Sequence, residues 1–174
     1  MHSKRITRQS GFSLIEVLVS LAVLSVGMLG VGKLVLFTSR ANDSAYLRSQ
    51  ATALAYTILD SMRANRQTAL TGSYTVAYGT YANPGVSCNT AASACSGTIG
   101  AQYDLYQWKS RLLVALGSTG DGQIVTVPVP DATTGATNVT ATIQVKWNDT
   151  VAQQSFGATA ASAQAAVIIL QSVL

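Results

Sequence analysis

Residues 11–37 read GFSLIEVLVSLAVLSVGMLGVGKLVLF, and this almost unbroken apolar run decides the fold. Between Glu16 and Lys33 the run carries no charge. At about 1.5 Å per residue, a helix of this length is long enough to cross a bilayer. The apolar residues surround the helix instead of forming one stripe, which indicates that lipid or other helices surround it.

A short basic tail precedes the apolar run, as it does in a secretory signal. An ordinary signal, however, places its small-residue cleavage site after the apolar segment. Here the small residue, Gly11, comes before that segment, and an acid, Glu16, lies near its start. A carboxylate in this position needs a partner, and the apolar run supplies none. Cleavage after Gly11 would expose the α-amino group of Phe12, a cation able to pair with Glu16 of a neighbouring copy.

Residues 11–18, GFSLIEVL, resemble the class III leader of type IV prepilins and type II secretion pseudopilins. The motif combines a basic leader, a glycine before an aromatic residue, and a glutamate as the fifth residue of the processed chain. The resemblance implies that prepilin peptidase cuts between Gly11 and Phe12 and N-methylates Phe12. It also implies that Glu16 neutralises a neighbour's amino terminus during subunit assembly. A plain membrane anchor with a chance glutamate is the alternative.

The net charge of the whole chain is +4, but much of it lies in the leader. Three of the eleven Lys and Arg residues precede Gly11, which leaves eight cations against seven acids and a net charge of +1 after processing. The basic pI is therefore no argument for nucleic acid binding, and no nucleic acid partner is expected. By the positive-inside rule, the leader charges hold the tail in the cytoplasm. We expect a single-pass protein of the inner membrane with its head in the periplasm.

The helical pattern continues beyond the apolar run and becomes amphipathic. No proline precedes Pro84, so one helix is expected from about Phe12 to about Asn65. We divide the chain into a leader (1–11), a transmembrane and assembly helix (12–38), the amphipathic half of the same helix (39–66) and a globular head (67–174). The expected apolar stripe consists of Leu47, Ala51, Leu54, Ala55, Ile58, Leu59 and Met62.

Gly27, Gly30 and Gly32 interrupt the apolar half of this helix. Each costs a helix roughly 0.8–1 kcal/mol relative to alanine. One interpretation is close approach between helices, which small residues favour in membranes. The other is that this segment loses helicity when subunits leave the bilayer and stack. The sequence does not choose between them.

The head is predicted to contain a second helix at 101–116 and strands at 74–78, 124–127 and 140–147. Residues 165–174 are expected to form a buried strand or helix, and their β-branched side chains favour a strand. The second helix has Leu105, Trp108, Leu112 and Leu116 at helical spacing. A tight turn is expected at 120–122, and Pro128 and Pro130 are expected to end the strand at 124–127. The predicted fold class is α+β and type IV pilin-like, with a long N-terminal helix packed against a small antiparallel sheet.

Further patches are similar to the PilV family of minor pilins (type IV pilus modification proteins). These patches are residues 61–65, Cys88 with Cys95, residues 104–108 and residues 145–147. Membership would imply a low-abundance structural subunit that initiates and builds type IV pili for twitching motility and adhesion, at or near the pilus tip. It would also imply as partners other minor pilins, the major pilin, prepilin peptidase, the inner-membrane assembly platform and a tip adhesin. Unlike many pilins, the chain lacks a C-terminal disulfide-bonded loop.

The only two cysteines, Cys88 and Cys95, are expected to form a disulfide in an oxidising periplasm, with two free buried thiols as the alternative. The only histidine, His2, lies in the leader, so neither a metal site nor a histidine-dependent nucleophile is expected. No cofactor motif occurs, and we expect no enzymatic activity. The acids considered for an acid–base pair, which show no such spacing, are Asp104, Asp121, Asp131 and Asp149.

Two alternatives to a pilus subunit stay open on the sequence alone. A minor pseudopilin of type II secretion would share the leader, the fold and Glu16. A DNA-uptake or adhesion module carried on a pilin stalk would use its head to bind a ligand. Trp108, Trp147, Tyr103 and Tyr106 are candidates for such a binding face, although core packing is the favoured interpretation because no basic stripe accompanies them.

Overall fold

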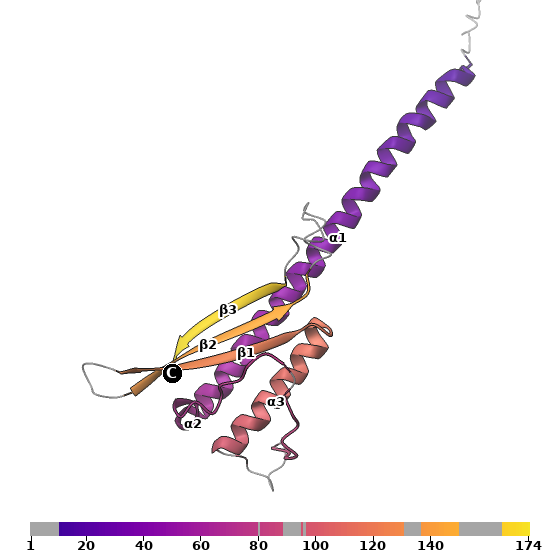
Figure 1. The fold of residues 1–174 in the computed structure, drawn as a ribbon. Helices are drawn as coiled ribbons and strands as arrows, with labels where there is room; N and C mark the ends of the chain where they lie inside the picture. The colour runs from indigo at the N-terminus through magenta and orange to yellow at the C-terminus, as the bar shows by residue number, and fades with distance from the viewer. Residues whose placement is uncertain (1–10, 80, 89–94, 96, 131–136, 150–164) are drawn as a thin grey trace, which may run out of the picture. The chain divides into compact units, whose positions relative to one another are not determined.

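The computed structural model describes residues 11–79, 81–88, 95, 97–130, 137–149 and 165–174. The chain divides into two compact units, which meet between Arg40 and Ala41 in the sequence. The elements, in chain order, are α1 (Leu14–Ala64), α2 (Arg66–Leu70), α3 (Gly97–Leu116), β1 (Asp121–Pro130), β2 (Thr137–Trp147) and β3 (Ala166–Val173). Figure 1 shows their arrangement.

The long N-terminal helix is confirmed as α1, which runs for 51 residues. All residues from 11 to 40 are exposed. From Ser44 onward the helix becomes one-sided, and the predicted stripe is buried in the second unit. Ala51, Ala55, Ile58, Leu59 and Met62 lie in the core, with Leu47 and Leu54 packed against it.

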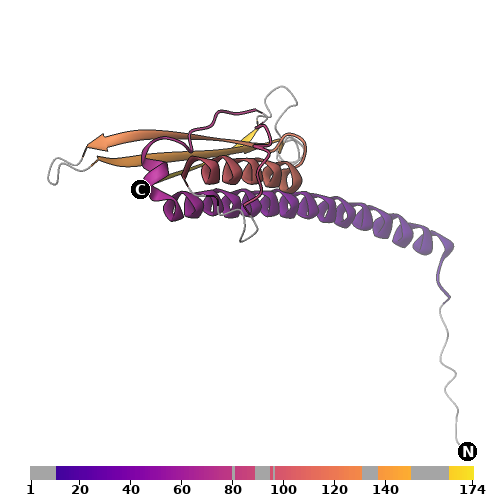
Figure 2. The ribbon, with the colours of Figure 1, turned by 90° about the horizontal axis from the view of Figure 1, so that it is seen from below.

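The second predicted helix is confirmed as α3, which begins four residues earlier than expected, at Gly97. Its four apolar residues at helical spacing are all buried. In Figure 2, α3 and the second half of α1 lie side by side on the same face of the sheet. The indole N–H of Trp108 donates a hydrogen bond of 3.0 Å to the carbonyl of Leu54, which joins the two helices inside the core.

The sheet is a three-stranded antiparallel meander in the order β1-β2-β3. Its central strand, β2, alternates between buried and half-buried side chains, as the sequence predicts. Ile143 is aligned with Ile124 of β1 and with Leu170 of β3. The inner face of the sheet therefore packs its branched side chains on the helices, and the α+β fold class is confirmed.

Three local predictions in the head were wrong. The segment 74–78 is not a strand, because Val76 makes one isolated bridge with Ile124 while Tyr74 is buried in the core. The turn falls at 117–120, where the Gly120 N–H donates to the Gly117 carbonyl, so Asp121 already belongs to β1. β1 ends at Pro130, as expected, but not at Pro128, because the missing N–H of Pro128 lies on the side of the strand that faces away from β2.

Candidate assembly site

The segment that precedes α1 contains the predicted cleavage site. Gly11, Phe12 and Ser13 are exposed and lie outside the helix. The carbonyl of Ser13 accepts hydrogen bonds from the backbone N–H groups of Glu16, at 3.0 Å, and Val17, at 3.3 Å. The first helical turn is thus closed directly after the Gly11–Phe12 peptide bond, which is left in an exposed segment outside the helix.

Glu16 occupies the first turn of α1, where a carboxylate interacts favourably with the helix dipole. Its side chain is exposed, and it has no cationic partner within the part of the chain that the structure describes. The next charge along the helix is Lys33, about 25 Å away at 1.5 Å per residue. The acid is therefore a single charge on a long uncharged surface.

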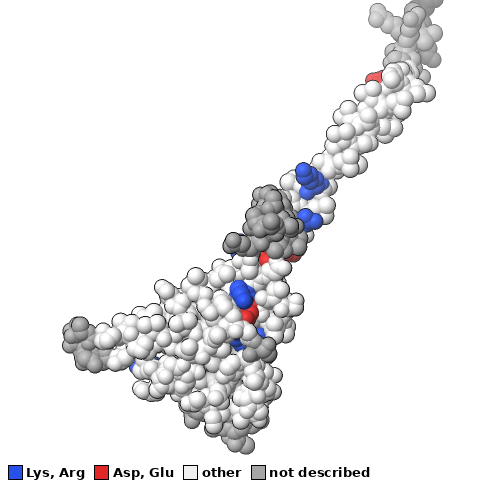
Figure 3. Space-filling model, in the orientation of Figure 1, with Lys and Arg blue, Asp and Glu red and all other residues white. Residues whose placement is uncertain are grey.

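That surface is apolar on every side. The best 18-residue window of α1 has a mean hydropathy of 2.3, and none of it is buried by the rest of the chain. By length and composition α1 is able to span a membrane. Figure 3 shows the uninterrupted uncharged surface between the acid near the start of the helix and the first cations. Seventeen large apolar side chains from Phe12 to Phe37 are exposed there, and water does not favour such a surface.

The helix continues without a break through Gly27, Gly30 and Gly32. A Cβ atom placed on any of these glycines would meet nothing within 4 Å. Packing among the described residues therefore gives no reason for these glycines. Both interpretations of the glycines, close packing on another helix and local melting on assembly, involve a molecule other than this one.

The structure places Cys88 and Cys95 in the second unit and joins them in a disulfide, with their Cα atoms 5.2 Å apart. This agrees with the sequence prediction. The carbonyl of Cys95 lies against the first turn of α3, because a Cβ added to Gly100 would stand only 3.0 Å from that oxygen. The bridge therefore lies beside the start of α3, on a unit separate from the one that holds Gly11, Phe12 and Glu16.

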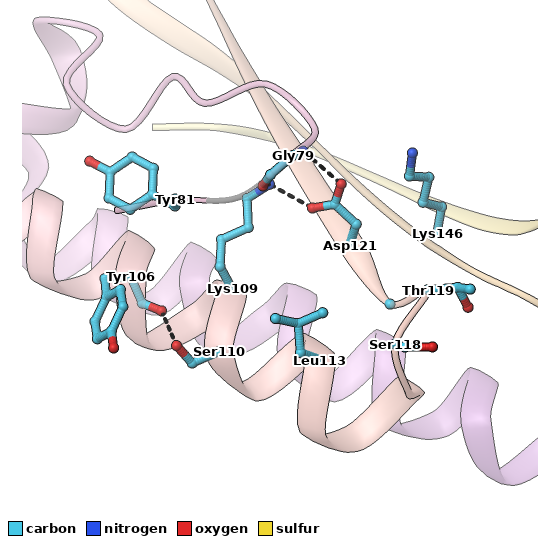
Figure 4. Close-up of a pocket in the computed structure, with 11 residues that line it drawn as sticks. Gly79, Tyr81, Tyr106, Lys109, Ser110, Leu113, Ser118, Thr119, Asp121 and Lys146 are labelled. Atoms are coloured by element: carbon cyan, nitrogen blue, oxygen red, sulfur yellow. Dashed lines mark hydrogen bonds and ion pairs between the residues drawn. The ribbon is translucent and has the colours of Figure 1, made fainter. Parts of the chain in front are cut away.

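A buried ion pair in the head was missed by the sequence reasoning. Lys109, on α3, donates from its Nζ to Oδ1 of Asp121 at 2.6 Å and to the carbonyls of Ala77 and Gly79 at 2.9 and 3.0 Å. Figure 4 shows Lys109 and Asp121 meeting between the helix and the start of β1. The available signal was that Lys109 lies between Leu105 and Leu112 on the apolar stripe of a predicted helix, where a charge requires a buried partner.

The Asp121 carboxylate also accepts the backbone N–H groups of Gly79, at 2.8 Å, and Gly122, at 2.7 Å. Burial by itself would raise the pKa of Asp121. The hydrogen bond from Lys109, the two backbone donors and the positive charge of Lys109 outweigh burial and lower that pKa below its ordinary value. The carboxylate therefore stays charged and fastens the 77–79 segment to β1 and α3.

A pocket of about 390 Å³ opens beside this ion pair, lined among others by Tyr81, Tyr106 and Lys146. Lys109 forms part of its wall, but all three N–H bonds of its ammonium group are directed at protein acceptors. Lys146 lies 4.0 Å from the ring centre of Tyr78.

The described acids that were considered as a catalytic pair each have a partner of their own. Asp104 accepts the Tyr74 hydroxyl at 2.7 Å. Asp149 is buried and accepts the Ser44 hydroxyl at 2.6 Å, while Asp131 lies outside the described residues. Burial, followed by the hydrogen bond to Asp104, raises the pKa of Tyr74 well above its usual range, so this hydroxyl stays protonated and acts as a donor. These hydrogen bonds join distant segments of the head, which is a structural role for Asp104 and Asp149.

The two tryptophans proposed for a binding face are core residues. Trp108 and Trp147 are 3% and 1% exposed, while Tyr103 and Tyr106 are half-buried on α3. Bases stack only on exposed aromatic rings. The favoured interpretation of the tryptophans, core packing, is confirmed.

A long N-terminal helix, apolar and exposed in its first half and packed on a small antiparallel sheet in its second, is the architecture of a type IV pilin. The family model described as "Prokaryotic N-terminal methylation motif" matches residues 6–32. The match supports a protein of the type IV pilin and pseudopilin superfamily, which is processed by prepilin peptidase, anchored in a membrane and assembled with other pilins. A search of curated proteins and one of solved structures found no match.

Proposed function

We propose that the chain is a structural minor pilin of the PilV kind. In this proposal residues 1–11 are removed as a leader, and residues 12–38 anchor the chain in the inner membrane with the head in the periplasm. The subunit then enters a pilus, at or near its tip, and helps to initiate its assembly. Residues 39–66 and the head at 67–174 form the folded part. The observation that carries the proposal is the isolated Glu16 on an exposed apolar helix.

The chemistry of assembly follows from that isolated charge. Cleavage after Gly11 creates an α-ammonium group on Phe12, and N-methylation leaves it a cation at neutral pH. A charge that enters a bundle of apolar helices is strongly disfavoured unless it is paired. The Glu16 carboxylate of one subunit pairs with the Phe12 α-ammonium group of the next. Helices packed against one another would also cover the exposed apolar surface that lipid covers before assembly.

The test is the variant Glu16→Ala, produced in a strain that lacks the chromosomal copy. We expect membrane insertion and leader removal to stay largely intact and incorporation into sheared pili to fall. Ser25→Ala is the matched control, because it changes an exposed polar residue of the same helix whose hydroxyl only donates to the Leu21 carbonyl. Immunoblots of the membrane and sheared-pilus fractions measure both steps. Wild-type amounts of the Glu16→Ala protein in pili would refute the pairing of Glu16 with Phe12.

A minor pseudopilin of type II secretion has the same leader and the same acid. Deletion of the gene, with piliation, twitching and secretion of exoproteins scored in parallel, separates the two functions. The pilus proposal expects lost or reduced piliation with normal secretion. Lost secretion with normal pili would assign the chain to the secretion system instead.

A further inference from the structure

The sheet has two edges, and β1, which forms one of them, is protected. Val76 pairs with Ile124 through two hydrogen bonds, of 2.8 and 3.0 Å, on the side of β1 that faces away from β2. The hydroxyls of Thr75 and Thr126 meet beside that bridge at 2.6 Å. Even-numbered residues of β1 thus direct their backbone groups outward, and two of them, Pro128 and Pro130, have no N–H. Partial cover and proline are known means of preventing a strand from pairing further.

The opposite edge, β3, has neither protection. The Leu174 N–H donates to the Val139 carbonyl at 2.9 Å, so even-numbered residues of this strand face β2. Backbone groups alternate along a strand. The N–H and C=O groups of Val167, Ile169, Gln171 and Val173 therefore point away from the sheet. Among the described residues, the one hydrogen bond that reaches them is a 3.3 Å contact from the Ser172 hydroxyl to the Val173 carbonyl.

The side chains of β3 also leave this edge of the sheet without the protection that the β1 edge has. The strand reads AVIILQSV and contains no charge and no proline. Val167, Ile169 and Val173 stand on the outer face of the sheet and are exposed, Ile169 by 59%. Figure 1 shows β3 as an outer strand of the sheet. A long, uncharged, apolar edge is a template for further strand pairing.

We propose that the free edge of β3 binds an extended, uncharged segment of another polypeptide, which adds a fourth strand to the sheet. The backbone of the bound segment supplies acceptors and donors to the four outward residues of β3. Its side chains alternate, and its apolar ones pack beside those of Val167, Ile169 and Val173 on the outer face. Only an extended backbone repeats its hydrogen-bonding groups at the spacing that this edge presents. The lack of charge on β3 gives no attraction to a charged partner.

The experiment measures backbone amide exchange, residue by residue, on the full chain in detergent. The probe is a short synthetic peptide of alternating valine and threonine with a lysine at each end. In the free chain we expect fast exchange at the outward amides of Ile169 and Gln171, and slow exchange at the inward amides of Leu170 and Ser172. The peptide should slow the outward amides by about tenfold or more. The same peptide, N-methylated at every residue and so without an N–H group on either edge, should not.

Two variants at Ile169 separate the contribution of its backbone N–H to peptide binding from that of its side chain. Ile169→Pro removes an outward N–H without removing a hydrogen bond to β2, and it should abolish the protection by the peptide. Ile169→Ala, the matched control, keeps the N–H and should keep the protection. The N-methylated peptide keeps the test decisive if Ile169→Pro does not fold.

Three results would overturn the proposal. Slow exchange of the outward amides in the free chain would mean that another part of the same chain already covers the edge. Equal protection by the N-methylated peptide would show that the contact is not backbone pairing. Protection that rises with protein concentration, without peptide, would assign the edge to a second copy of this chain instead of another polypeptide.

Discussion

Replacing Lys109 by methionine tests whether the buried ion pair stabilises the head. The side chains of Lys109 and Asp121 are only 7% and 20% exposed. Breaking a buried pair by removing one partner costs about 3–5 kcal/mol. We expect the lower end, about 3 kcal/mol, because Asp121 keeps its two backbone donors and some contact with water. With a slope of about 1.5 kcal/mol per M, the urea midpoint should fall by about 2 M.

Trp108 and Trp147 are both buried in the head, so their fluorescence in detergent-solubilised full chain reports the unfolding transition. The control is Arg63→Ala, which removes the exposed pair between Arg63 and Asp60, whose side chains are 53% and 71% exposed. An exposed pair at this spacing is worth about 0.5 kcal/mol or less, so its midpoint should move little. Equal shifts for Lys109→Met and Arg63→Ala would refute the claim that the buried pair holds the head together.

Three further predictions follow from the described contacts. The pKa of Asp121 lies below its ordinary value of 3.8, so its contribution to stability is present above about pH 4 and is lost as the pH falls through the lowered value. Urea unfolding at a series of pH values should therefore show that the wild-type protein loses stability in acid. The stability of Asp121→Asn should depend less on pH. Cys88→Ser should lower the free energy of unfolding by about 2.5 kcal/mol, and reduction of the wild-type bridge to Cys95 should have the same effect; an unchanged midpoint in both would mean that other contacts hold the loop. Gly11→Ala should leave the leader uncut, seen as a heavier band on a gel, and normal processing of that variant would contradict the proposed cleavage site.

Much of the candidate assembly site was readable because it is local in the chain. Gly11, Phe12 and Glu16 lie within six consecutive residues. The uncharged run that follows Glu16 shows, from the sequence alone, that this acid has no nearby partner in its own helix. The helices and the central strand were equally readable, because burial on one side imposes a period on the residues themselves. The stripe from Leu47 to Met62 is an example, since its spacing predicts the face that the sheet covers.

The local predictions failed where a distant contact overrides a local pattern. The alternation at 74–78 is typical of a strand, but the Tyr74 hydroxyl reaches Asp104 and leaves only Val76 to pair. The short helix α2, at Arg66–Leu70, had no predicted counterpart. Pro128 was expected to end a strand, yet a proline is tolerated wherever the missing N–H faces an edge, and the sequence does not say which strand is an edge.

The sequence by itself determined the apolar helix, the isolated Glu16, the α+β class and the two cysteines, because each depends on neighbouring residues or on composition. Only the tertiary structure decided that Lys109 meets Asp121, that Ser44 meets Asp149 across 105 residues, and that β3 is the unprotected edge of the sheet. The physical reason is that these features depend on which distant segments the fold brings together. Periodicity along the chain records which face of an element is buried, but it does not record which element lies beside it.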